Sequence, residues 1–145
     1  MHGRHAPFIA AFALAALPLV VTARPAGARP EMPHLRGTYV GGCQSRAGGV
    51  WASDLTFFQQ SGSLLGGQLS IAAVYPDVYL AGKCSRGGRF TLSGKSGSGP
   101  GTVRIRLQGR YQPGTDQEPA VLTGTYTVTG AHRDRGTFRL LGGTR

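Results

Sequence analysis

The chain is short of the side chains on which most enzyme chemistry depends. Its 145 residues include only 6 Asp and Glu, 4 His and 2 Cys. Two cysteines do not supply a four-ligand zinc site, and so few carboxylates give little basis for metal cages or for paired acids and bases. We therefore expect a protein that is not an enzyme and that binds no cofactor or metal.

Long apolar runs are equally scarce, and the one that is present lies at the start. Residues 8–21 are apolar, Arg4 precedes them, and small-x-small patterns follow at 21–23 and 26–28. The run is shorter than the roughly 20 residues of a bilayer-spanning helix. This pattern is typical of a secretory signal peptide over 1–28, cleaved after Ala28 or, as an alternative, after Ala23. A membrane anchor is the competing interpretation.

Cleavage at Ala28 leaves one domain, residues 29–145, with a strong excess of positive charge. Only Arg4 and Arg24 are lost, so 14 of the 16 Lys and Arg remain against 6 acids, a net charge of +8. We expect a soluble, basic protein that is secreted or periplasmic and has no membrane span after cleavage.

Cys43 and Cys84 are the two cysteines of this domain. In an oxidising compartment, a disulfide between them is the expected state. A redox-active pair is disfavoured because the C-x-x-C spacing is absent.

A short repeat indicates the architecture. The pattern L-x-G-x-x begins at Leu35, Leu65, Leu80, Leu92, Leu107 and Leu122, and a relative of it closes the chain at 136–140. Within each copy, apolar and polar residues alternate with the period of a strand. In 102–111, Val103, Ile105 and Leu107 point one way, whereas Arg104 and Arg106 point the other.

The same alternation predicts eight strands, separated by Gly, Pro, Ser and Asp. They are expected at 35–43, 50–60, 63–74, 78–85, 89–96, 102–111, 120–129 and 135–141. Short connections favour an antiparallel meander. Because glycines recur in the inward phase and permit strong coiling, we expect an all-β fold, an eight-stranded meander closing into a small β-barrel. A two-layer β-sandwich is the alternative.

The L-x-G-x-Y strands, the Cys in the first strand and the closing G-T-F-R-L resemble small bacterial secreted and lipoprotein domains. More loosely, they are similar to ligand-binding barrels of the avidin and lipocalin type. The resemblance covers about residues 35–141. It implies a β-barrel, and no ligand-contacting motif of those families is found in this chain.

Two surfaces of such a barrel are candidates for binding. The interior would hold one small apolar or aromatic ligand, with inward glycines leaving volume for it. The candidate lining residues are Tyr39, Trp51, Phe57, Tyr111 and Tyr126. The alternative is an interior filled completely by side chains.

The second candidate is a basic outer face on the fifth and sixth strands. Its predicted anion-binding residues are Arg89, Lys95, Arg104, Arg106 and Arg110. No aromatic residue accompanies them in those strands' outward phase, so sequence-specific nucleic-acid recognition is not expected. The sequence thus predicts an exported, non-catalytic binding module for a small hydrophobic molecule in the barrel. The alternative partner is a polyanion or cell surface held by the outer face.

Overall fold

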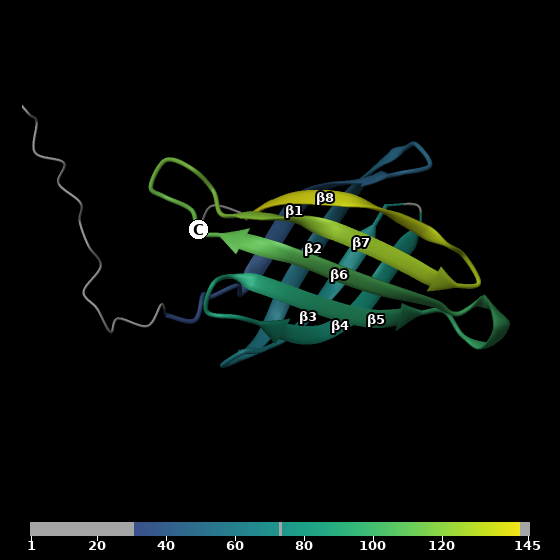
Figure 1. The fold of residues 1–145 in the computed structure, drawn as a ribbon, viewed down its shortest axis with the longest axis horizontal. Coiled ribbons are helices and arrows are strands. Elements are labelled where there is room, and N and C mark those ends of the chain that lie inside the picture. The colour runs from purple at the N-terminus through teal and green to yellow at the C-terminus, as the bar shows by residue number, and fades with distance from the viewer. Residues whose placement is uncertain (1–30, 73, 143–145) are drawn as a thin grey trace, which may run out of the picture.

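Eight antiparallel strands form one closed barrel in the structure, a computed structural model that describes residues 31–72 and 74–142 (Figure 1). Each strand pairs with the next along the chain, and β8 pairs with β1. The strands are β1 (Gly37–Ser45), β2 (Val50–Ser61), β3 (Leu64–Ile71), β4 (Tyr75–Cys84), β5 (Arg89–Ser96), β6 (Val103–Gln112), β7 (Val121–Gly130) and β8 (Asp134–Gly142), with one short 3-10 turn, η1 (Gly99–Gly101), before β6.

The predicted fold class is confirmed, and closure excludes the sandwich. Seven residue pairs join β1 to β8, from Tyr39 opposite Gly142 to Ser45 opposite Gly136. No described residue belongs to a helix long and apolar enough to cross a membrane. The predicted signal peptide over 1–28 lies outside the described residues.

The predicted strand boundaries are wrong mainly between β3 and β4. The Tyr-Pro-Asp sequence at 75–77 was expected to be a turn, yet it begins β4. The turn lies earlier, where the Val74 N–H donates to the carbonyl oxygen of Ile71 (3.1 Å). A register shift between Leu69 and Ile71, with Asp77 at φ 53°, accommodates these turn-forming residues within the strand.

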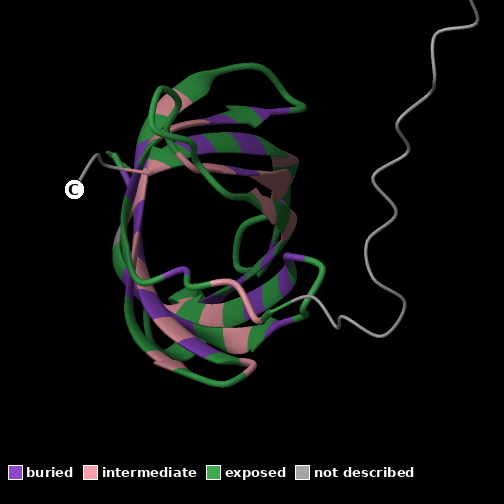
Figure 2. Cartoon of the chain, turned by 90° about the vertical axis from the view of Figure 1, so that its left-hand side faces the viewer, coloured by how far each residue is buried: buried purple, intermediate pink, exposed green. Residues whose placement is uncertain are grey.

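Side-chain alternation divides the inside of the barrel from the outside. Along β6, Val103, Ile105 and Leu107 are buried, whereas Arg104 and Arg106 are exposed. Figure 2 shows the same banding of buried and exposed residues around the wall. The pattern is the one predicted from the sequence, because the side chains of a strand alternate between its two faces.

A bulge in β2 also changes this phase. The register with β3 shifts between Phe57 and Gln59, so Phe58 and Gln59 are both exposed and the inward phase resumes at Gln60, opposite the buried Leu65. Beyond the bulge, the Gln60 amide binds the segment before β1. Its Oε1 accepts from the Leu35 N–H (2.9 Å), and its Nε2 donates to the carbonyl oxygen of Pro33 (2.7 Å). Leu35, expected in the first strand, instead precedes β1 and is fully buried.

Glycines in the inward phase are sites of close approach between chain segments. At Gly82, a Cβ would overlap the carbonyl of Thr91 on β5. At Gly109, it would lie within 3.0 Å of both the Phe90 and the Phe138 rings. These positions are therefore covered by neighbouring backbone and side chains, and they do not leave the open volume that an interior ligand was expected to use.

Gly82→Ala tests this packing. We expect a loss of about 2–3 kcal/mol in the free energy of unfolding, because the Cβ meets rigid backbone that does not yield as a flexible side chain would. Gly101→Ala is the matched control, since a Cβ there meets nothing within 4 Å. Urea unfolding followed by the fluorescence of the single tryptophan, Trp51, measures both. Equal stability of the two variants would contradict the packing described here.

Candidate anion-binding face

The outer surface of β5–β8 carries a continuous group of cations, here called the cationic face. All of its charged side chains are exposed and in the outward phase of their strands. They are Arg89, Lys95, Arg104, Arg106, Arg110, Arg135 and Arg139. The six acidic residues of the chain are all among the described residues, and none stands at an outward position of these four strands.

Strand registers place these cations in rows across the face. Lys95 lies opposite Arg104, and Arg89 lies opposite Arg110. The hairpin of β5 and β6 thus brings together the cations that were predicted on these two strands. Like charges on directly opposite residues destabilise a sheet. These two pairs therefore lower the stability of the folded protein, whereas pairs of opposite charge would not.

A row of threonines runs through the middle of the cationic face. In β7, the outward residues are Thr123, Thr125, Thr127 and Thr129. Thr127 lies between Arg106 of β6 and Arg135 of β8. Because neighbouring strands lie about 4.8 Å apart, the backbones of the two arginines are about 10 Å apart with a hydroxyl between them. Hydroxyl and guanidinium donors together suit phosphate, sulfate or carboxylate groups.

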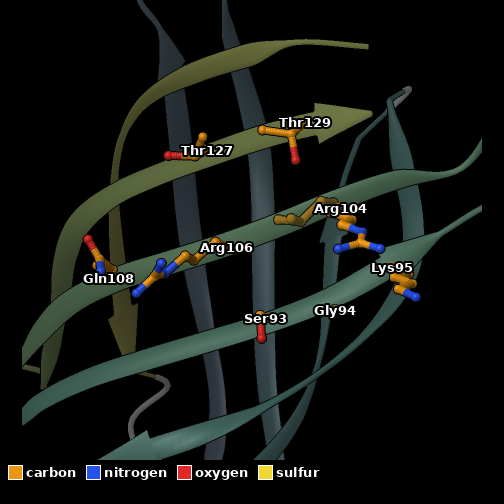
Figure 3. Close-up of a pocket in the computed structure, with 9 residues that line it drawn as sticks. Ser93, Gly94, Lys95, Arg104, Arg106, Gln108, Thr127 and Thr129 are labelled. Atoms are coloured by element: carbon orange, nitrogen blue, oxygen red, sulfur yellow. The ribbon is translucent and has the colours of Figure 1, made fainter. Parts of the chain in front are cut away.

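A shallow hollow of about 590 Å³ lies over β5, β6 and β7 in this face. Figure 3 shows its lining: Ser93 and Lys95 come from β5, Arg104, Arg106 and Gln108 from β6, and Thr127 and Thr129 from β7. Gly94 and Ile105 also line the hollow. Every other lining residue has a side chain with a hydrogen-bond donor. The hollow can hold an anionic group against three strands at once.

The structure brings the five predicted cations onto one surface and adds members that the sequence analysis missed. Arg135, Arg139 and the threonine row were missed because β8 becomes their neighbour only through the pairing of β7 with β8. The R-x-T-x-R pattern at 135–139 and the T-x-T-x-T-x-T pattern at 123–129 were the available signals.

The predicted interior residues form part of the packed core. Tyr39, Phe57 and Tyr126 are buried, and Trp51 and Tyr111 are partly buried against the core. The Phe57 ring contacts Tyr39 at 5.8 Å between centroids and Phe90 of β5 at 6.5 Å. Phe90 in turn contacts Phe138 of β8 at 6.2 Å. The Phe57–Phe90 and Phe90–Phe138 contacts join strands that are not neighbours and therefore fill the space across the barrel.

A polar network occupies the end of the barrel near the turn between β1 and β2. Asp134 accepts hydrogen bonds from the Ser45 hydroxyl (2.6 Å), the Tyr126 hydroxyl (2.8 Å) and the Arg135 N–H (2.8 Å). Burial acts to raise the pKa of Asp134, but these hydrogen bonds and the charge of His132 outweigh it and hold that pKa below its ordinary value. Burial and the Asp134 carboxylate raise the pKa of Tyr126 strongly.

The predicted disulfide is wrong, because Cys43 and Cys84 are both free. Both face the interior as expected, but the phase of a strand does not fix the height of a residue in the barrel. Cys43 lies two residues from the end of β1, whereas the Cys84 N–H donates to Ser63, in the turn between β2 and β3. That turn and the turn preceding β2 stand at opposite ends of a 12-residue strand. The two sulfur atoms are thus too far apart for a bond.

Both thiols are protected by their surroundings. Burial raises the pKa of Cys43, as does the charge of Asp134, although a hydrogen bond from the Ser53 hydroxyl (3.1 Å) opposes the shift. Burial also raises the pKa of Cys84. The thiolate is the reactive form, so neither cysteine is suited to redox or nucleophilic chemistry.

Three comparisons, with protein-family models, with curated proteins and with solved structures, find no match to this chain. The described residues contain no group of three or more His, Cys, Asp or Glu arranged to hold a metal ion. Assignment of a function therefore rests on the geometry of the barrel and its cationic face.

The free cysteines give a direct prediction. Protein purified without reductant should contain two titratable thiols per chain after unfolding in denaturant, and these should react far more slowly in the folded state. A thiol reagent with a chromogenic leaving group measures both. Absence of thiols in the unfolded, unreduced protein would contradict the arrangement of Cys43 and Cys84.

Asp134 makes stability depend on pH in the acid range. Because its pKa is lowered on folding, it stabilises the protein above the ordinary value of 3.8, and this contribution disappears as the pH falls through the lowered value. We expect Asp134→Asn to cost about 1 kcal/mol at pH 7 and progressively less in stronger acid. Asp54→Asn, on the outer face of β2, is the control. A difference between wild type and Asp134→Asn that does not change with pH would contradict this role.

Proposed function

We propose that this protein is an exported, non-catalytic binding module that holds an anionic polymer against its cationic face. The observation that carries the proposal is the set of seven exposed cations on four adjacent strands, with no acidic residue at an outward position of those strands. Export rests on the leader-like sequence at 1–28.

An extended ligand suits the spacing of the charges. Lys95 and Arg104 stand at one end of the face, Arg89 and Arg110 at the other, and Arg135 and Arg139 lie beyond the threonine row. A single small anion contacts only a few of these groups. A chain carrying repeated charges contacts many of them together, and the sum of weak contacts gives useful affinity that falls with salt.

The cross-strand pairs of like charge also favour a binding role. Lys95 opposite Arg104 and Arg89 opposite Arg110 each cost stability in the free protein. An anion placed between such cations removes the repulsion when it binds. A face that served only solubility has no need of adjacent like charges.

The alternative, a small hydrophobic ligand inside the barrel, has less support. The rings of Phe57, Phe90 and Phe138 would have to separate to admit it, and packed cores resist such changes. Titration with an apolar probe tests this alternative through Trp51 fluorescence, with a salt-independent change expected only if the interior binds.

Charge reversal tests the proposed function. We expect Arg104→Glu with Arg106→Glu to reduce affinity for heparin at least tenfold, because two contacts become repulsive. Arg36→Glu with Gln59→Glu and Ser61→Glu makes the same change of −4 in net charge, at or before the end of β2, and should have a much smaller effect. Heparin-column elution and calorimetry over a range of salt concentrations measure both variants. Equal losses in the two variants would show that net charge alone, and not this face, governs binding.

Lys95→Glu separates function from stability. It replaces repulsion with attraction to Arg104, so we expect the unfolding free energy to rise by up to about 1 kcal/mol while heparin affinity falls. Urea unfolding and calorimetry on the same sample provide the two values. If stability and affinity instead fall together, the loss of binding would reflect damage to the fold.

A further inference from the structure

An exposed aromatic pair stands on the outer surface beside the cationic face. The Phe58 and Tyr79 rings meet edge to face, with 6.3 Å between centroids and an interplanar angle of 75°. Tyr79 is 67% exposed and Phe58 is 47% exposed. Phe58 is an outward residue of β2 at the bulge, and its ring lies over Gly66, where a side chain would begin 3.8 Å away. Phe58 thus supports Tyr79 and leaves much of the tyrosine ring free.

The strand register places Tyr79 near Lys95, which lines the hollow. The pairing of β4 with β5 ends at Leu80 opposite Gly94, and the outward residues Tyr79 and Lys95 come next beyond this last pair. Lys95 is opposite Arg104, which is opposite Thr129. One row therefore runs from an aromatic ring across two cations to a hydroxyl, over four strands spaced about 4.8 Å apart.

A hydrogen-bond acceptor stands on the other side of Tyr79. The Gln68 side chain, on the residue opposite Tyr79, donates through Nε2 to the Asp77 carboxylate at 2.6 Å. Asp77 is exposed and lies two residues before Tyr79 on the same face of β4. An ionised carboxylate accepts hydrogen bonds and repels other anions.

We propose that the polymer bound by the cationic face is an acidic polysaccharide, with one sugar ring seated on Tyr79. This inference rests on the proposed function and specifies its ligand. A sugar residue offers an apolar C–H face for the tyrosine ring and hydroxyl donors for Asp77. Its carboxylate or sulfate groups, and those of the next residues, meet Lys95 and Arg104. The hydroxyls and amide of Ser93, Gln108 and Thr129 match the many hydroxyls of such a chain.

This combination of groups disfavours a nucleic acid strand. Single-strand binding sites combine cations with aromatic side chains on which successive bases stack. Here the aromatic group is one edge-to-face pair and not a series of rings on which successive bases could stack. The hydroxyl donors of a sugar residue, which a phosphate group lacks, also suit the Asp77 carboxylate beside the pair.

Four probes and three variants test the proposal. The probes are an alginate oligosaccharide, heparin, polyphosphate, which has charge but no rings, and an oligothymidylate single strand. Tyr79→Ala should weaken alginate and heparin binding roughly five- to tenfold, the scale of one lost ring-stacking contact. Tyr79→Phe should stay within about twofold of wild type, because the ring persists. Val50→Ala removes another exposed apolar side chain, 72% exposed, and should have no effect.

Polyphosphate makes the outcomes distinguishable. Its affinity should be unchanged by Tyr79→Ala, since it uses the cations alone. Unchanged alginate affinity in Tyr79→Ala, or tighter binding of oligothymidylate than of alginate at equal charge, would overturn the polysaccharide assignment while leaving the anion-binding function intact. Failure of every probe, polyphosphate included, to bind the wild-type protein would overturn the proposed function itself.

Discussion

The pairing of β8 with β1 is the constraint on which the rest of the structure depends. It leaves no free strand edge, and it gives every residue of the wall either an inward or an outward place. Inward residues form one core, in which aromatic rings from β2, β5 and β8 meet across the interior. Outward residues of β5–β8 are then held at the fixed spacing of a sheet, and this spacing turns scattered arginines into a face.

Close approach of the strands explains why glycine is frequent in the wall. Inward positions such as Gly82 and Gly109 are covered by a carbonyl group or by aromatic rings, so any side chain there would meet occupied space. The same residues that allow the barrel to curve tightly thus leave its interior filled. This is why we place the proposed binding site on the outer surface.

Periodicity in the sequence was sufficient to predict the fold and part of the site. Alternation in β6 placed Ile105 inside and Arg106 outside, and the five predicted cations do share one surface. The disulfide between Cys43 and Cys84 was wrong because alternation gives the side of a strand, whereas a bond also requires the same height in the barrel. The bulge after Phe57 was not predicted, because it breaks the two-residue period and no local residue pattern indicates it. The contact of Phe58 with Tyr79 was not predicted either, since it depends on how β2, β3 and β4 are aligned.

The most direct test of the account is the location of bound polyanion on the folded protein. Backbone amide chemical shifts, recorded by NMR during titration with a short heparin or alginate oligosaccharide, report that location residue by residue. We expect changes concentrated on β5–β8 around Arg104, Arg106 and Thr127, extending to Tyr79. Changes concentrated among interior residues such as Phe57 and Phe90, with β6 and β7 unaffected, would contradict it.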